Sequence, residues 1–489
     1  LGHANAGCNA SQLVCGRKAW MPPAGVEYQK KKLRKLVGMS RFASTSQVPA
    51  ANDGSSIANG PTKVRYGVLA FAVLMAVILY LDRMAISVPV PAIAADLDLS
   101  TTAVGDSVAA FFWCYAFFQV PAGWLGDRWG GRRALTLYAT VWSLAMVGLA
   151  TADGMLALVA ARGLLGIGQA GAYATTASFL RRWMPFSRRG LASSAVSLGG
   201  RAGGVLAPAL TPFLMQLAAA WTGQAGRWRL PFVIYAAAGL IWAVAFWRWF
   251  RDAPALHRGV NAAEIALIEG HESVGSAPST VGTMPLVAIA SHRSLQLLGL
   301  IMFSVNVGWI FLATWLPTYL IEVHHCSEKQ AGLYTSLTAA AGMAGCLAGG
   351  FATDFLVARL GLVWGRRIPG IISYGGAALG LLGVWAMNDV AAIVSLLVLS
   401  SFLGDFALGS IWATSQDIGG PFAGTVLGWS NMCGNIGAAV AISVIGRLVA
   451  HFGWPVTFIL SSSAYVVGAL GWLGVDPRAP LHPVHPPSE

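Results

Sequence analysis

About a dozen long apolar stretches fill the chain between Lys63 and Asp476, and each is long enough to cross a lipid bilayer. A spanning helix needs about 20 predominantly apolar residues. Charged residues make up 11% of the sequence, whereas soluble globular chains carry about 25%. The stretches do not alternate polar and apolar residues as the strands of a membrane β-barrel do. We therefore predict an all-α membrane protein with spans at 66–92, 103–125, 134–152, 154–180, 190–219, 229–250, 295–321, 330–356, 368–388, 390–416, 420–447 and 455–475.

The net charge of +12 follows from membrane topology rather than from binding to nucleic acid. Arginines crowd the loops after the even-numbered spans: Arg128, Arg132, Arg133, Arg181, Arg182, Arg188, Arg189, Arg251, Arg258, Arg293, Arg359, Arg366 and Arg367. The opposite loops hold mainly aspartates, with Arg227, Arg229, Lys329 and Arg447 as exceptions. Positive residues favour the cytoplasmic side of a membrane. We expect the even-numbered loops and both termini in the cytoplasm, and no nucleic-acid partner.

Residues 1–62 differ in composition from the rest of the chain, being rich in Ser, Ala, Asn and Lys. We expect a disordered tail there, whose basic cluster at 30–35 contacts anionic lipid. Two interpretations of its origin remain open. It is a transit peptide, or, as we favour, the start site is placed too far upstream and the true beginning is Met21 or Met39.

The chain shows no motif for a metal, a cofactor or catalysis. Its six cysteines have neither metal-ligand spacing nor the pattern of a disulfide framework. The glycine-rich runs at 163–168 and 199–204 lie inside apolar spans, so they are not nucleotide-binding loops. The sequence therefore predicts no cofactor, no metal and no enzymatic activity.

One motif occurs twice, once in each half of the membrane region. The run GWLGDRWGGRR at 123–133 ends the second span, and a weaker copy at 349–367, which includes Asp354, ends the eighth. A polar stretch at 252–293 separates the halves. Internal repeats of this kind are typical of transporters built from related halves.

The first run resembles the signature loop of the major facilitator superfamily. Finer features are similar to its anion:cation symporter family, which includes bacterial sugar-acid transporters, vesicular glutamate transporters and sialin. These features are YLDR at 80–83, FFWCYAFFQVP at 111–121, Arg162 seven residues before Gln169, WRLPF at 228–232, His257 to Glu264, TWLPTY at 314–319 and IWATSQD at 411–417. The resemblance covers roughly 64–475.

The resemblance implies a major facilitator fold of twelve transmembrane helices in two pseudo-symmetric six-helix bundles. We expect the N-terminal bundle at 63–251, a cytoplasmic central loop at 252–293, the C-terminal bundle at 294–475 and a cytoplasmic tail at 476–489. The resemblance further implies a multi-pass monomer of the cell (inner or plasma) membrane. Such a protein moves its substrate by alternating access around a midplane site.

Charges inside the spans mark the candidate site. Arg83, Arg162 and Arg201 stand mid-span in the N-terminal half with Asp82, and Asp405 is the lone mid-span charge of the other half. Ionisable groups in the membrane are costly and generally functional. Three arginines against two carboxylates leave a positive cavity, which predicts an anionic substrate.

By resemblance, Arg83 binds the substrate carboxylate and Asp82 carries a proton. Arg162 offers a planar donor fork for carboxylate or sulfate and shares a helix face with Gly166, Gln169 and Tyr173. Gly166 leaves room for a ligand or a crossing helix. The family's sugar-acid and glutamate transporters have glutamate where Gln169 stands, and that glutamate takes part in proton coupling, which a neutral amide cannot do.

Other candidates have alternative interpretations. Arg201 lies between glycines. It contacts the ligand or takes part in gating, or alternatively its glycines mark a point where two helices cross. Asp405 is a second proton site or the partner of an arginine, which is Arg162 in one alternative. The uncharged candidates for substrate binding are Tyr80, Tyr115, Gln169, Ser410, Trp412 and Asn431, of which Asn431 matches a substrate-site asparagine of the family. By resemblance Asp127, Arg128 and Arg132, with Asp354 in the second copy, latch the halves together as a gate.

The sequence thus predicts a secondary active transporter of a small organic anion, such as galactonate, glucarate or a hexuronate, entering with protons. An anion exchanger or uniporter is the alternative within transport, and Gln169 favours it. A transporter-like ligand sensor is the alternative from another class.

Overall fold

The computed structural model describes residues 60–270 and 283–481, so most of the predicted tail at 1–62 and of the tail at 476–489 lies outside the described residues. All described residues belong to one unit of the chain, 55–489. Their secondary structure is helical, without a strand in the described ranges. The apolar sequence forms helices because a helix satisfies every backbone N–H and C=O within its own segment.

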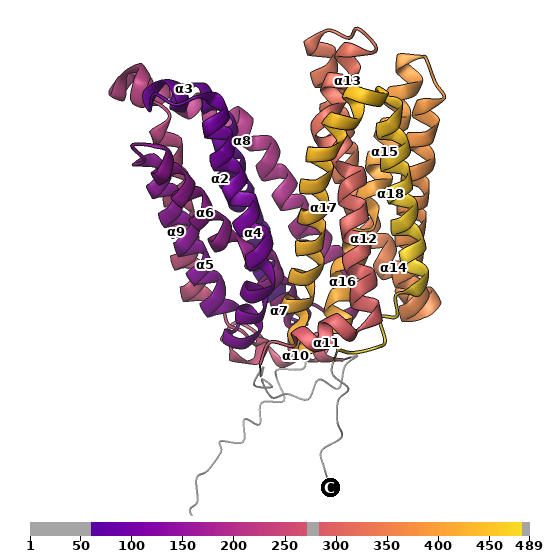
Figure 1. The fold of residues 1–489 in the computed structure, drawn as a ribbon. Helices are drawn as coiled ribbons and strands as arrows, with labels where there is room; N and C mark the ends of the chain where they lie inside the picture. The colour runs from indigo at the N-terminus through magenta and orange to yellow at the C-terminus, as the bar shows by residue number, and fades with distance from the viewer. Residues whose placement is uncertain (1–59, 271–282, 482–489) are drawn as a thin grey trace, which may run out of the picture. The chain divides into compact units, whose positions relative to one another are not determined.

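The N-terminal half is coloured indigo to magenta in Figure 1. Its α-helices are α2 (Val64–Met84), α3 (Val90–Asp96), α4 (Thr101–Trp129), α5 (Gly131–Ala150), α6 (Met155–Ala170), α7 (Ala172–Trp183), α8 (Arg189–Gly226) and α9 (Arg229–Trp249). Two short helices follow in the central loop, α10 (Ala262–Glu269) and α11 (Leu286–Ser291).

The C-terminal half is coloured orange to yellow. Its helices are α12 (Arg293–Ile310), a π-helical turn at Phe311–Trp315, α13 (Leu316–Glu322), α14 (Glu328–Trp385), α15 (Val390–Phe406), α16 (Leu408–Gly419), α17 (Ala423–Phe452) and α18 (Pro455–Gly474).

In the described ranges, ten apolar helical stretches are long enough to cross a membrane, and two of them contain two crossings each. The 58 residues of α14 would extend about 87 Å at 1.5 Å per residue, roughly twice the thickness of a bilayer. The helix turns back at Gly361, where φ is 77°. The stretch Val390–Phe452 is likewise divided at Gly420, with φ 52°. The prediction of twelve transmembrane helices is therefore confirmed.

Four of the twelve spans are interrupted, and they recur at every third span. The first contains a 3-10 turn at Ala85–Ser87, and the seventh contains the π-helical turn. The fourth divides into α6 and α7 at Gly171, and the tenth into α15 and α16 at Ala407. Interrupted spans in transporters place backbone and side-chain polar groups near the membrane midplane, where a substrate binds. Three of these spans, the first, fourth and tenth, carry Asp82, Arg83, Arg162, Gln169 and Asp405.

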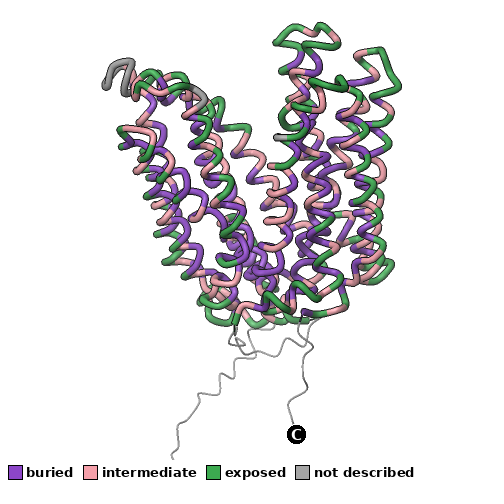
Figure 2. The backbone as a smooth tube through the Cα atoms, in the orientation of Figure 1, coloured by how far each residue is buried: buried purple, intermediate pink, exposed green. Residues whose placement is uncertain are grey.

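Helix pairing repeats between the halves. Helix α2 packs against α8 as α12 packs against α17, and α4 packs against α6 as α14 packs against α15. Between the halves, α4 and α7 pack against α17, and α8 packs against α14 and α16. Figure 2 shows buried residues concentrated where the halves meet, toward the end that carries α10 and α11.

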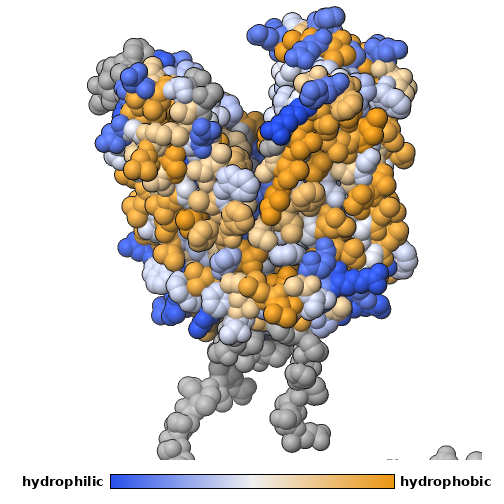
Figure 3. All heavy atoms as spheres, in the orientation of Figure 1, coloured by the Kyte–Doolittle hydropathy of each residue, from blue (hydrophilic) through white to orange (hydrophobic). Residues whose placement is uncertain are grey.

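The opposite end of this region is open. Figure 3 shows a hollow between the two halves at the end away from α10 and α11, with apolar side chains over the middle of this face. An apolar belt of this kind is what the hydrocarbon of a bilayer requires. At the open end Asp96 of α3 accepts hydrogen bonds from Trp228 and Arg229, which begin α9. This contact accounts for the Trp-Arg pair of the WRLPF motif.

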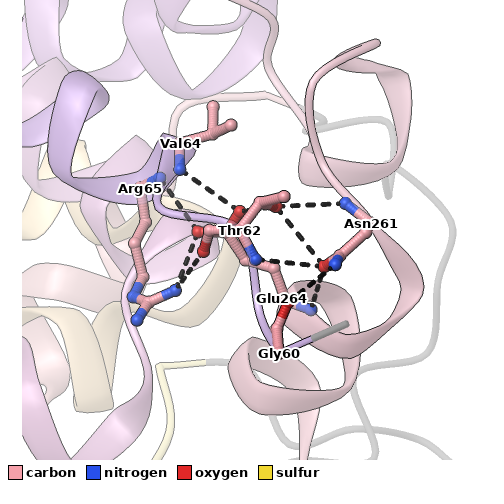
Figure 4. Close-up of polar contacts among 6 residues, drawn as sticks. All are labelled: Gly60, Thr62, Val64, Arg65, Asn261 and Glu264. Carbon is pink, nitrogen blue, oxygen red and sulfur yellow. Dashed lines mark hydrogen bonds and ion pairs between the residues drawn. The ribbon is translucent and has the colours of Figure 1, made fainter. Parts of the chain in front are cut away.

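The central loop is fastened to the first span by Glu264 (Figure 4). Its fully buried carboxylate accepts hydrogen bonds from the backbone N–H groups of Val64 and Arg65, at 3.3 and 3.1 Å, and pairs with the Arg65 guanidinium at 2.8 Å. Thr62 donates its hydroxyl to the same carboxylate. An acidic group at a helix N-terminus is stabilised by the unpaired N–H groups there. Glu264 thus acts as an N-terminal cap for α2 supplied by α10.

Candidate functional site

Arg83 lies in a cluster of aromatic rings in the N-terminal half. Its guanidinium lies 4.3 Å from the ring centroid of Tyr115, 4.7 Å from that of Tyr80 and 5.0 Å from that of Phe111. Its Nε donates to Gln169 Oε1 at 3.4 Å. The rings stabilise a cation through their negative faces but supply no counter-charge. Arg83 is 7% exposed, and one of its terminal nitrogens has no hydrogen-bond partner in the described part of the chain.

Arg162 lies on α6, close to the same cluster. Its guanidinium lies 4.8 Å from the Phe111 centroid and is fully buried, and within the ranges that the structure describes its Nε and Nη1 have no hydrogen-bond partner. The space beside Gly166 is occupied by a crossing helix, because a Cβ there would lie 2.4 Å from the carbonyl oxygen of Phe111. Gln169 is also fully buried and donates from Nε2 to the Leu79 carbonyl at 3.1 Å.

Asp82 faces away from these arginines. Consecutive helical residues point in different directions, so Asp82 does not pair with Arg83. It is fully buried, and neither carboxylate oxygen has a hydrogen-bond partner among the described residues. The Tyr235 hydroxyl of α9 lies within its electrostatic reach and is 3.1 Å from the hydroxyl of Thr211.

Arg201 and Asp405 form an ion pair between the two halves. Arg201 Nη2 on α8 lies 2.5 Å from Asp405 Oδ1 on α15. The flanking glycines also allow α8 to cross close to α2. A Cβ on Gly199 would lie 2.7 Å from the Val73 carbonyl of α2, and one on Gly203 would lie 2.2 Å from the Val77 carbonyl. Of the predicted partners for Asp405, the structure places Arg201 there rather than Arg162.

Aromatic side chains connect the two groups of charges. Tyr80 packs edge-on against Tyr173 at 6.3 Å between centroids, and Tyr173 packs edge-on against Trp412 at 5.3 Å. Gly200 fits between Tyr80 and Tyr173, since a Cβ there would overlap the Tyr173 hydroxyl. Tyr173 was not among the predicted site residues, although it shares the helix face of Arg162 and Gln169.

The remaining polar candidates lie apart from this cluster or bond elsewhere. Ser410 is fully buried and donates to the Arg366 carbonyl at 2.5 Å, so its hydroxyl serves the contact of α16 with α14. Asn431 lies on α17 and is half-buried; its backbone carbonyl accepts a hydrogen bond from Asn435.

The repeated motif joins the halves through two helix caps. Asp127, in the last turn of α4, accepts hydrogen bonds from the N–H groups of Gly424 and Thr425 at 2.9 and 2.7 Å, where α17 begins. The hydroxyls of Thr425 and Ser178 donate to it as well. Asp354 accepts from the N–H groups of Gly190 and Leu191, both at 2.9 Å, where α8 begins. Each aspartate therefore holds the first turn of a helix in the opposite half.

The two arginines predicted for the gate contact their own half. Arg132 Nε donates to the Trp247 carbonyl at 2.8 Å, and Arg128 lies 5.2 Å from the Trp124 ring centroid. The ion pairs near the second cap involve residues that the sequence did not single out. Arg366 donates to Asp417 at 2.9 Å, and Arg189 lies 3.7 Å from Asp417 across the halves. The occurrence of Asp417 at the end of the IWATSQD motif was the available signal.

Asp127→Asn is expected to shift the protein away from the conformation that is open at the end opposite α10. The substitution removes the charge at the N-terminus of α17 and turns an amide donor toward one of the two N–H groups there. Loss of a cap costs about 1 kcal/mol, and 1.4 kcal/mol is a tenfold change in population. Spin labels at Leu156 and Met387, on opposite halves at the open end, should show a shorter distance in the variant.

Asp252→Asn is the matched control, because Asp252 accepts from the Arg132 N–H within one half. It should leave the distance distribution unchanged. An unchanged distribution in Asp127→Asn would contradict the gate.

Comparison with known proteins shows the family. The family model described as Major Facilitator Superfamily matches residues 72–442. The chain belongs to the major facilitator superfamily. Solved structures share the fold: the proton:xylose symporter XylE has a TM-score of 0.63 at 18% identity, with 84% of this chain and 96% of that chain covered. The human organic anion transporter MFSD10 has a TM-score of 0.62 at 16% identity, with 84% and 100% covered.

Curated relatives are transporters of organic anions. The "Probable sulfoacetate transporter SauU" of Cupriavidus necator is 32% identical over 85% of this chain and 94% of its own length. The hexuronate transporter of Bacillus subtilis is 28% identical, with 84% and 94% covered, and the D-galactonate transporter of Escherichia coli is 27% identical, with 84% and 96% covered. The predicted resemblance is confirmed, and the chain is a multi-pass membrane transporter rather than an enzyme.

Proposed function

We propose that this superfamily member is a secondary active transporter that moves a small organic anion by alternating access, in symport with protons. The observation that carries the proposal is the pair of buried guanidinium groups of Arg83 and Arg162, which belong to the interrupted first and fourth spans. Neither has a carboxylate partner among the described residues. Buried cations require an anion, which the substrate would supply.

The arrangement of the halves supports a route to this site. The hollow between the halves at the open end leads toward the midplane, and the Asp127 and Asp354 caps close the other end. Arg201 is partly exposed, with 24% of its side chain accessible. An anion that reaches Arg201 competes with Asp405 and so acts on a contact between the halves. Binding can thereby favour one conformation over the other.

The substrate class follows from the site and the relatives together. We propose a sugar acid or another small carboxylate, whose acid group meets Arg83 and whose hydroxyls meet Tyr80, Tyr115 and Trp412, with Asn431 added on closure. We further propose a monomer in the cell membrane with both termini and the 252–293 loop in the cytoplasm, and bundles at 63–251 and 294–475.

Anion exchange or uniport is the second candidate, and Gln169 favours it. A coupling glutamate at this position could bind and release a proton, whereas an amide does not titrate. Anion exchange requires no bound proton; it requires only that the transporter with the anion bound can change conformation.

Uptake by purified protein in liposomes tests the proposal. Vesicles are given radiolabelled D-galactonate or D-glucarate with and without an inward proton gradient. Symport predicts accumulation above the external concentration only with the gradient. Exchange predicts uptake only when unlabelled anion is inside. Binding without uptake under either condition would indicate a sensor and overturn the transport proposal.

A further inference from the structure

We infer that Gln169 makes this site selective for dianions, that is, for small molecules carrying two acid groups. The inference rests on the proposed function, in which an anion binds beside Arg83 and Arg162. It adds the charge that the substrate must carry and names the residue that sets it.

The site has two uncompensated positive charges close together. The guanidinium groups of Arg83 and Arg162 lie 5.0 and 4.8 Å from the centroid of one ring, Phe111. The ionisable neighbour that acts on Arg162 is Arg83, another cation. The neighbours of Arg83 are Tyr115, Tyr80 and Tyr173, which are neutral phenols. By contrast, Arg201 is already paired with Asp405.

Asp82 does not supply the missing charge. It is adjacent to Arg83 in sequence but lies on another face of α2, toward Tyr235. A buried carboxylate without a hydrogen bond is costly in its charged form, so its neutral form is favoured there. The two guanidinium groups therefore remain without a counter-charge in the described part of the chain.

Gln169 leaves them so because its side chain is neutral. Its amide nitrogen donates to the Leu79 carbonyl, which turns its oxygen toward Arg83 Nε. A glutamate in the same position could not donate to Leu79 when ionised, and it would place a negative charge against Arg83. Glutamate would thus neutralise one arginine and leave one charge for the substrate. Glutamine leaves both positive charges for the substrate.

A short molecule with two acid groups carries two negative charges, which match the two uncompensated positive charges of the site. Arg83 retains some exposure and is the contact residue, where its fork meets two oxygens of a carboxylate or sulfonate. Arg162 is enclosed in this conformation, and its charge acts on the ligand through low-dielectric surroundings, where screening is weak. A monoanion would compensate only one of the two cations.

Matched pairs of anions test the inference on the purified full-length protein at pH 7.5. D-Glucarate and D-gluconate differ only in the second carboxylate; sulfoacetate and its amide differ in the same way. Dissociation constants are measured by titration calorimetry for wild type, Gln169→Glu and Gln169→Met. Methionine has a similar size to glutamine but neither charge nor amide, so it separates charge from hydrogen bonding.

We expect wild type to bind the dianion of at least one pair tenfold or more tightly than its matched monoanion. Gln169→Glu should reduce this ratio to about one, and Gln169→Met should preserve it. Equal binding of monoanion and dianion by wild type would overturn the inference while leaving anion transport intact. A ratio unchanged in Gln169→Glu, or lost in Gln169→Met, would show that the charge at 169 does not set selectivity. Binding of none of the four anions would count against both the inference and the proposed function.

Discussion

Arg83→Lys is expected to weaken anion binding by about 100-fold while the protein still folds. Lysine keeps the positive charge but loses the planar fork that meets two oxygens at once. It also loses contact with three aromatic rings, at 4.3 to 5.0 Å from the guanidinium. A charge-assisted hydrogen bond is worth about 1.5–3 kcal/mol and a cation–π contact about 0.5–2 kcal/mol, so a loss of roughly 3 kcal/mol is reasonable. Each 1.4 kcal/mol corresponds to about tenfold in affinity.

Arg162 should respond differently because it is enclosed and acts through its charge. Arg162→Lys is expected to weaken binding less than Arg83→Lys, whereas Arg162→Ala should weaken it strongly. Binding is measured by titration calorimetry and transport by uptake into liposomes. Arg359→Lys is the control, since Arg359 is exposed beside Phe355 and should tolerate the change. Wild-type transport by both Arg162→Lys and Arg162→Ala would remove Arg162 from the site.

The membrane fold could be predicted from sequence because hydropathy is a local signal. Each span can be recognised from the hydropathy of its own stretch of about 20 residues. The interruptions are less visible: Gly171 and Ala407 divide their spans without a proline, and the π-helical turn at Phe311–Trp315 has no distinctive composition. These features depend on packing against neighbouring helices, which composition does not record.

The choice of partners for buried charges could not be predicted, because it depends on contacts between distant parts of the chain. Asp405 pairs with Arg201, 204 residues away, although Arg162 was an equal candidate by charge. Gly166 could have faced a ligand or a helix, and only the position of α4 decides for the helix. The separation of Asp82 from Arg83 was predictable, since adjacent helical residues point about 100° apart.

Sequence repetition identified the gate better than it identified the site. Asp127 and Asp354 occupy equivalent places in the two copies of the motif, and each caps a helix of the opposite half. The ion pair beside the second cap could not be predicted from the motif in this way. Arg366 lies in the second copy but Asp417 does not, and the two residues meet only when α16 packs beside α14.

Asp82→Asn is expected to abolish accumulation of the substrate against a gradient and yet permit exchange of anion across the membrane. With an amide at position 169, Asp82 is the main candidate for carrying the proton. In the part of the chain that the structure describes, its carboxylate is fully buried and has no hydrogen-bond partner, and it lies one residue from Arg83. An anion that binds Arg83 reduces the positive charge near Asp82, so the substrate strengthens the preference of Asp82 for its protonated form. By linkage, the proton favours substrate binding by the same factor, which is the thermodynamic basis of symport.

The measurement is uptake into liposomes under an inward proton gradient, followed by exchange with unlabelled anion inside at equal pH. Asp96→Asn is the matched control. Hydrogen bonding from Arg229 lowers the pKa of Asp96, which therefore stays ionised near neutral pH and cannot carry the coupled proton. That variant should still accumulate substrate. Gln169→Glu, which adds a titratable group beside Arg83, should shift the pH dependence of uptake. If wild type moves its substrate without proton flux at any pH and Asp82→Asn transports normally, the protein is an exchanger or a uniporter, and Asp82 has no part in coupling.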